Sequence, residues 1–264
     1  MGTAAKNEMK GSDPLVSIVV PCYNEQDNIV SCVNQLEKAL SPARTPFEII
    51  LVNDGSADDT LEKAHSLSMS RAFVRVVDLG GNFGKTVALK EGVRRARGDI
   101  IAFFDADLQY TPQDLVTMIS RLNERIDFVN GSRDYNGYGV SRTAFSRLYN
   151  QIVRLLFRME IRDSNCGVKV LRREAADANT IFGYGLPLVV PLLKIRGFDS
   201  IEVPVTLRDR KAGESKYFQD GQFLGGTKNL RDIIFHSIML LNLLAHAPLE
   251  WGSKDRQADH PVNS

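Results

Sequence analysis

Short apolar runs alternate with longer amphipathic segments through the first half of the chain. The runs are rich in β-branched residues and lack strict polar alternation, which is typical of strands buried on both faces of a sheet. The segments between them repeat apolar residues at helical spacing. This order predicts an α/β fold with a mainly parallel sheet flanked by helices. The predicted strands are 15–20, 47–53, 73–79 and 99–105, and the predicted helices are 26–40, 58–69 and 85–97.

The pattern changes in the second half of the chain. Thr111 and Pro112 precede a further helix, residues 127–131 form the next predicted strand, and a late strand is expected at 200–207. An arginine-rich amphipathic helix is predicted at 141–159. The expected organisation is a flexible segment 1–14, one domain 15–217 with halves 15–131 and 132–217, a C-terminal helical region 218–248 and a flexible tail 249–264.

Charge, cysteine content and the chain ends limit which partners and which cellular compartment the sequence predicts. The 33 lysines and arginines balance 32 acidic residues, so no global field favours nucleic acid. Cys22, Cys32 and Cys166 lack metal-ligand spacing and are predicted to be free thiols. No apolar signal segment opens the chain, which favours the cytoplasm. The apolar run 233–249 is shorter than the ~20 residues of a membrane span, so a helix on a membrane surface, a buried helix and a subunit contact all stay open.

Polar residues follow two of the first predicted strands. In open α/β sheets ligands bind outside the carboxyl ends of the strands. Pro21 is expected to stop the first strand, after which Tyr23 offers a ring for stacking and Glu25 a carboxylate. Asp54 sits in a tight turn after the second strand, where Ser56 or Asp58 can cap the next helix. These strand ends are therefore candidate binding positions.

The segment FFDADLQ ends the fourth predicted strand. In an extended chain Asp105, Asp107 and Gln109 point to one side and bring three oxygen-bearing side chains together. Such oxygens are the ligands that Mg²⁺ or Mn²⁺ takes, usually with water and substrate phosphates. The segment predicts a divalent-metal site.

Gly84-Lys85-Thr86 raises the question of a P-loop. A P-loop has four residues between its first glycine and Gly-Lys, whereas Gly80 lies one residue too close. A nucleotide-hydrolysing protein therefore remains only as an alternative.

Four motifs together resemble family 2 glycosyltransferases of GT-A fold: VSIVVPCYNE, LVNDGSADDT, GNFGKTVALKEG and IIAFFDADLQ, in that order. The resemblance makes 15–131 the nucleotide-sugar half and 132–217 the acceptor half. It implies metal ligation by Asp107 and Gln109, and a catalytic role for Asp105, Asp107 and Arg210. It also implies that the nucleotide sugar is held by Pro21, Tyr23, Glu25, Asp54, Gly84, Lys85, Asp105, Ser215 and Lys216.

The second half resembles the dolichol-phosphate mannose synthases and their polyprenyl-phosphate relatives. The residues that carry this likeness are NGSRDY, Arg142 with Ser146, DSNCG and the loop RKAGESK. The resemblance implies that Arg133, Arg142 and Ser146 bind the acceptor phosphate. Processive members carry Gln-x-x-Arg-Trp, which the only tryptophan, Trp251, does not complete. Where the subgroup usually has Gly-Phe-Arg, this chain has Gly167-Val168-Lys169, which leaves the role of Lys169 open.

The acceptor chemistry agrees with this resemblance. A phosphate monoester has a second pKa of about 6 and is already a nucleophile at neutral pH, so no general base is needed. A hydroxyl acceptor would need one, and Asp134 and Asp163 are then the candidates. A binding module that holds the sugar nucleotide without turnover is a further alternative.

The expected function is metal-dependent, inverting transfer of one hexose from a nucleoside-diphosphate sugar, GDP-mannose or UDP-glucose, to a polyprenyl phosphate. Inversion is implied by the resemblance alone. The expected location is the cytoplasmic face of a membrane, reached peripherally or through a membrane subunit.

Overall fold

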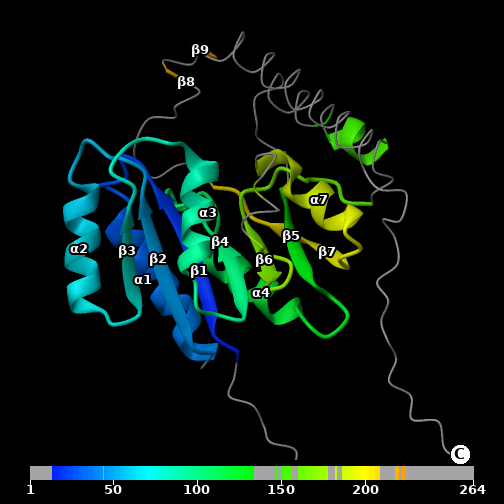
Figure 1. Ribbon diagram of the computed structural model, residues 1–264, viewed down its shortest axis with the longest axis horizontal. Helices are drawn as coiled ribbons and strands as arrows, with labels where there is room; N and C mark the ends of the chain where they lie inside the picture. The colour runs from blue at the N-terminus through cyan, green and yellow to red at the C-terminus, as the bar shows by residue number, and fades with distance from the viewer. Residues whose placement is uncertain are drawn as a thin grey trace, which may run out of the picture.

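A seven-stranded sheet forms the centre of the computed structural model, which describes residues 14–43, 45–133, 147, 150–155, 160–177, 182, 186–208, 218–219 and 222–223. The strand order is β3-β2-β1-β4-β6-β5-β7 (Figure 1). The strands are β1 Val16–Cys22, β2 Phe47–Asn53, β3 Val74–Asp78, β4 Ile100–Phe103, β5 Phe128–Arg133, β6 Lys169–Arg172 and β7 Ser200–Val205.

Most strands of this sheet are parallel, as the sequence predicts. Strand β1 pairs in parallel with β2 and β4, β2 with β3, and β5 with β7. The exception is β6, which lies antiparallel between β4 and β5. The sequence pattern did not predict β6. Its direction matters because its first residue lies beside the carboxyl end of β4.

Helices cover both faces of the sheet (Figure 1). Buried side chains of α1, α2 and α4 pack in one core cluster, and those of α3 and α7 pack in another. Their bounds are α1 Ile29–Leu40, α2 Thr60–Ser70, α3 Lys85–Arg95, α4 Pro112–Arg121 and α7 Val189–Ile195, with short 3₁₀ turns η1 Ser41–Ala43 and η2 Leu186–Leu188. Because helices cover both faces of the sheet, its strands are buried on both sides and consist of continuous apolar runs.

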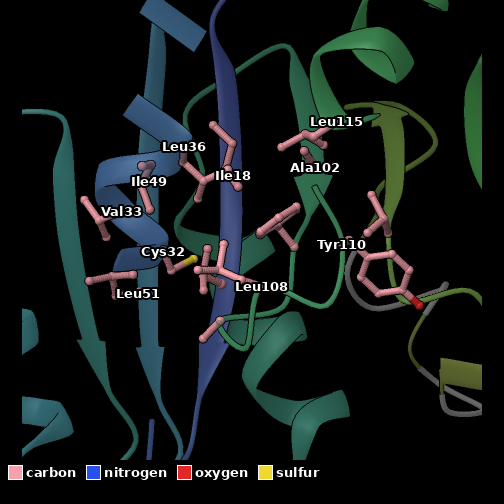
Figure 2. Packing of buried hydrophobic residues seen from close by; sticks show 14 of the residues in the cluster. Ile18, Cys32, Val33, Leu36, Ile49, Leu51, Ala102, Leu108, Tyr110 and Leu115 are labelled. Carbon is pink, nitrogen blue, oxygen red and sulfur yellow. The ribbon is translucent and has the colours of Figure 1, made fainter. Parts of the chain in front are cut away.

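Successive residues of β1 supply the two cores in turn. Ile18 and Val20 belong to the cluster with α1, whereas Val19 belongs to the cluster with α3. Figure 2 shows Cys32 and Leu36 of α1 packed over Ile18 and its neighbours on the sheet. The three cysteines are free, as predicted. They are also buried, and burial raises the pKa of each thiol.

Pro21 does not end the first strand, because β1 continues to Cys22 and pairs with β2 throughout. The carbonyl oxygen of Val19 accepts a hydrogen bond from Phe104 N, on the side of β4. Backbone groups alternate sides along a strand, so the nitrogen of Pro21 faces that same side, beyond the end of β4 at Phe103. No ladder bond is lost there, and the missing N–H of proline is tolerated.

Predicted features near the C-terminus fall largely outside the described residues. Residues 147 and 150–155 of the predicted helix 141–159 are helical. At the start of region 218–248, β8 Phe218–Gln219 pairs antiparallel with β9 Gln222–Phe223. Within the described ranges, no helix is long and apolar enough to cross a membrane, and the run 233–249 lies outside them.

A buried carboxylate ties together the opposite, amino-terminal edge of the sheet. Glu48 on β2 accepts hydrogen bonds from Ser17 Oγ at 2.6 Å, Arg75 Nη1 at 2.9 Å and Arg97 N at 2.7 Å. Burial by itself would raise the pKa of Glu48, but these hydrogen bonds and the charge of Arg75 lower it. The folded protein therefore holds Glu48 ionised.

Replacement of this carboxylate should destabilise the fold in a pH-dependent way. Because the pKa of Glu48 is lowered on folding, its stabilisation is present above its unfolded pKa, about 4.3, and is lost as the pH falls. We expect Glu48→Gln to lower the free energy of unfolding by about 2 kcal/mol at pH 7, measured by urea denaturation. The loss should shrink as the pH falls below about 4 and through the lowered pKa of the folded state, and the exposed Glu124→Gln should have little effect. An unchanged loss at low pH would contradict the ionic role.

Candidate functional site

The predicted donor residues gather at one edge of the sheet, beyond the carboxyl ends of β1, β2, β3 and β4. These four strands are parallel neighbours, so their following loops meet there. The loops are 23–28 after β1, 54–59 after β2, 79–84 after β3 and 104–111 after β4. Hydrogen bonds between these loops build the site.

The first two loops are joined side chain to backbone. Each bond pairs an amide of one loop with a side-chain oxygen of the other or of Thr60, the first residue of α2. Asn24, at φ 54°, takes part through both its amide and its side chain. The pairs are Asn24 N to Ser56 Oγ, Glu25 N to Thr60 Oγ1, Gln26 N to Asp58 Oδ2, Ala57 N to Asn24 Oδ1 and Asp59 N to Gln26 Oε1, at 2.8 to 3.3 Å.

Asp59 is the N-cap residue of α2 and makes no capping bond with its side chain, whereas Asp58, and not Ser56, bonds the first residue of the helix. Asp58 Oδ1 accepts from Thr60 N at 3.1 Å and from the Thr60 hydroxyl. Burial by itself would raise the pKa of Asp58, but hydrogen bonds from Thr60 and the Gln26 amide lower it. Ser56 instead serves the first loop. Tyr23 and Glu25 are half-buried in the loop after β1, and Glu25 Oε2 accepts from Asn28 Nδ2 at 2.7 Å.

Asp54 fixes the loop that carries the lysine. Its carboxylate is 3% exposed and accepts the amides of Phe83 at 2.7 Å and Gly84 at 2.9 Å. The neighbouring Gly55 has φ 67°, and a Cβ built there would lie 2.4 Å from the carbonyl carbon of Gly81. Only glycine permits this close approach. The predicted contact of Asp54 with the nucleotide stays a prediction, while its contact with the loop is observed.

Lys85 begins α3 directly after this loop. Gly84, at φ 90°, is the residue before the helix, and its carbonyl accepts from the amides of Val87 and Ala88. Lys85 Nζ lies 2.5 Å from Asp105 Oδ1. The lysine loop and the Asp-x-Asp segment therefore meet through an ion pair that the sequence analysis did not anticipate.

The Asp-x-Asp segment is a turn, and the extended geometry expected for it is wrong. Strand β4 ends at Phe103, the chain turns at Ala106 and Asp107, and Leu108 adopts φ 56°. Asp107 is 8% exposed, and its Oδ1 accepts from Gln109 N at 3.1 Å. Asp105, Asp107 and Gln109 are therefore not aligned on one side by the alternation of an extended chain. Metal binding by Asp107 and Gln109 remains a prediction from the resemblance.

The donor set suits a hard divalent cation. Asp105 and Asp107 offer carboxylate oxygens at the strand-end edge of the sheet. In the described part of the chain, no three acidic, histidine or cysteine side chains form a complete metal cluster. Mg²⁺ is commonly bound by one or two carboxylates together with substrate phosphates, so a full protein cage is not required. The residues present therefore fit a metal held jointly with a diphosphate.

A segment from the second half reaches this same edge. Gly167 N donates to the hydroxyl of Tyr110 at 3.2 Å, and Figure 2 shows that hydroxyl pointing away from the apolar cluster. A Cβ on Gly167 would lie 2.7 Å from Asp105 Oδ2 and 3.1 Å from the Tyr110 ring. Gly167 thus permits close approach to the acidic turn. Sequence reasoning recognised this glycine as part of a motif but not the contact.

Lys169 is a buried structural residue at the start of β6. It is 3% exposed and its Nζ donates to the carbonyl oxygen of Cys166. Burial lowers the pKa of Lys169 to about 8, despite the favourable charge of Asp163. The side chain thus braces the turn that presents Gly167.

Arg133 is already paired within the protein. Its Nε and Nη2 donate to the two oxygens of Asp163 at 2.7 and 2.8 Å, and its amide donates to the same carboxylate. The two side chains are 11% and 1% exposed. Burial by itself would lower the pKa of Arg133, but the hydrogen bonds and charge of Asp163 raise it. Binding of an acceptor phosphate by Arg133 stays a prediction.

The other predicted acceptor residues, and three of the predicted catalytic and donor residues, lie outside the described part of the chain. The structure brings together the donor-side positions Pro21, Tyr23, Glu25, Asp54, Gly84, Lys85, Asp105, Asp107 and Gln109 at one edge. The positions that it leaves undescribed are Asp134, Arg142, Ser146, Arg210, Ser215 and Lys216.

Comparisons with known proteins identify relatives of this chain. The chain is 31% identical over 205 residues to an undecaprenyl-phosphate 4-deoxy-4-formamido-L-arabinose transferase of Pseudomonas fluorescens, covering 76% of this chain and 60% of the relative. It is 28% identical over 203 residues to the Klebsiella pneumoniae protein of the same name, with 76% and 62% coverage. The chain therefore spans about 60% of the length of these relatives.

The fold also matches solved structures. Glucosyl-3-phosphoglycerate synthase from Mycobacterium tuberculosis, crystallised with UDP, superimposes with a TM-score of 0.62 at 19% identity, over 87% of this chain and 80% of that one. Another structure of that enzyme contains Mn²⁺, UDP and its product. Residues 17–179 match the family described as Glycosyl transferase family 2. The chain is thus a glycosyltransferase and not a P-loop nucleotide hydrolase, and it belongs to glycosyl transferase family 2.

Proposed function

We propose that the protein transfers one hexose from GDP-mannose or UDP-glucose to a polyprenyl phosphate, with inversion and with Mg²⁺ or Mn²⁺, at the cytoplasmic face of a membrane. It would reach the membrane peripherally or through a membrane subunit. Relatives named as undecaprenyl-phosphate sugar transferases support the acceptor class. The solved structures with UDP and Mn²⁺ share the fold and support the donor class.

The observation that carries the choice of acceptor is the state of Asp163. A hydroxyl acceptor needs a base to remove its proton. Asp163 is 1% exposed and held by the Arg133 guanidinium, so it is poorly placed to take a proton from a substrate. The other candidate base, Asp134, lies outside the described residues. A polyprenyl phosphate needs no base because it is already anionic.

The described residues have distinct parts in such a reaction. The joined loops after β1 and β2 would hold the base and ribose through Tyr23 and Glu25. Asp54 would hold the backbone of the loop before Lys85 in position for the diphosphate. Asp107 and Gln109 would hold the metal, with the carboxylate of Asp105 beside it, and the metal would stabilise the departing diphosphate.

On the acceptor side, Arg142 and Ser146 would hold the phosphate in line with the anomeric carbon. Arg210, Ser215 and Lys216 would close over the donor. Arg133, near the start of the acceptor half, would contact the acceptor phosphate while it stays paired with Asp163.

Transfer of radiolabel tests the proposal. The full chain is incubated with labelled GDP- or UDP-sugars, Mg²⁺ or Mn²⁺, and polyprenyl phosphate, and butanol-extractable label is counted. Labelled lipid that depends on the phosphate acceptor, and is lost with EDTA, is the expected result. Release of nucleoside diphosphate only with a hydroxyl acceptor would overturn the acceptor assignment and keep the donor half.

A further inference from the structure

The Lys85–Asp105 ion pair occupies the position where the donor and metal are expected to meet. Lys85 Nζ lies 2.5 Å from Asp105 Oδ1, so the ammonium is in direct contact with a candidate metal ligand. The side chains are 41% and 23% exposed, which leaves both within reach of solvent and ligand. Solvent screens an exposed pair of this kind, so another partner can replace either member.

The backbone beneath Lys85 is fixed while its side chain is long. The preceding Gly84 is bonded through its amide to Asp54 and through its carbonyl to the first turn of α3. A lysine side chain has a flexible four-carbon stem. The ammonium can therefore move away from Asp105 without any movement of the loop or the helix.

Charge makes the ammonium and a divalent metal compete. Asp105, Asp107 and Lys85 together carry one net negative charge. A divalent metal alone would reverse that sign and place two cations beside Asp105, which like-charge repulsion disfavours. The diphosphate of a sugar nucleotide, with a negative charge on each phosphate, would make the net charge of the site negative again. It would also offer Lys85 a new anionic partner.

We infer that Lys85 is a resident counter-ion that opposes metal binding at Asp105 until a nucleoside diphosphate draws it away. Metal and nucleotide then bind with positive coupling, and the metal site is completed only when donor is present. This inference rests on the proposed nucleotide-sugar donor and assigns the chain's own lysine a part in the order of binding. It commits to one consequence: removal of the ammonium must favour metal binding in the absence of nucleotide.

Mn²⁺ titration followed by electron paramagnetic resonance tests this directly. We expect Lys85→Met to bind Mn²⁺ about tenfold more tightly than the wild type without nucleotide, a size typical of coupling between sites. UDP or GDP should raise Mn²⁺ affinity strongly in the wild type and much less in Lys85→Met. Lys85→Arg, which keeps the charge, should resemble the wild type.

A matched control lies on the same helix. Lys90→Met removes one positive charge from α3, and Lys90 forms no ion pair within the described ranges. It should leave Mn²⁺ affinity near that of the wild type. Circular dichroism checks that each variant is folded.

The outcomes separate this inference from the proposed function. Mn²⁺ affinity of Lys85→Met equal to or below that of the wild type without nucleotide overturns the inference, as does failure of folded Lys85→Met to bind Mn²⁺. An equal gain in Lys90→Met would reduce the effect to general charge and also overturn it. If neither UDP nor GDP binds, the donor assignment fails, whereas the nucleotide-free titration still decides whether Lys85 opposes the metal.

Discussion

Asp107→Ala is expected to lower sugar transfer about a thousandfold, because loss of a carboxylate that fixes a metal removes electrostatic stabilisation of the leaving diphosphate. Asp107 lies in the turn after β4 and is largely buried. The measurement is the initial rate of labelled lipid formation at saturating donor. Asp107→Asn is the finer test, since its side-chain oxygen can still accept from Gln109 N while the charge is gone.

Asp99 provides the matched control for this experiment. It is an exposed aspartate at the opposite end of β4, where Oδ2 accepts from Leu15 N at 3.2 Å. Asp99→Ala removes the same charge from the opposite flank of β4 and should retain activity. If Asp107→Asn kept more than a tenth of wild-type activity, ligation by Asp107 would be wrong.

Asp54→Asn should weaken donor binding about tenfold to hundredfold, the range expected when one hydrogen bond to a charged group is lost. Oδ1 accepts the amides of Phe83 and Gly84, and Oδ2 accepts the Gly84 amide as well; in asparagine an NH₂ donor replaces one of these oxygens and faces an amide donor. The loop below Lys85 would lose one anchor. Isothermal titration with UDP and GDP in the presence of Mg²⁺ measures the change.

Asp58→Asn distinguishes a specific loss of donor affinity in Asp54→Asn from general destabilisation of the loops after β1 and β2. Asp58 lies four residues away, and its carboxylate accepts hydrogen bonds from Thr60 and from the amide of Gln26. Its replacement should cost about 1 kcal/mol of stability, typical of a lost hydrogen bond, with donor affinity nearly retained. Equal losses of affinity in both variants would show that Asp54 has no special relation to the lysine loop.

The donor half was largely predictable because its signals are local. The strand 47–53 was predicted with the bounds that β2 has, and Thr111 caps α4 as its position before Pro112 indicates. Parallel neighbours then bring the strand ends together by geometry alone. The prediction of an extended chain after β4 was wrong. Leu108 has a positive φ there, a conformation that leucine rarely adopts and that the local sequence does not indicate.

The parts that sequence missed depend on distant partners. Strand β6 has four residues and takes its place only because β4 and β5 lie on either side. The Arg133–Asp163 pair joins residues 30 positions apart. Helix α7 contains Pro191 in its first turn and is buried over its first five residues, so it shows neither strand nor helical periodicity. Such features follow from tertiary packing and have no local pattern.

The bonds that join the loops after β1 and β2 have a consequence for protein engineering. Every one of the five pairs uses a side chain from one partner and a backbone amide from the other. A chimera that imports residues 23–28 alone from a relative with another donor would lose side-chain acceptors on both sides of the junction. The unit that can be exchanged is therefore the pair of segments, 23–28 together with 54–60, transplanted as one piece.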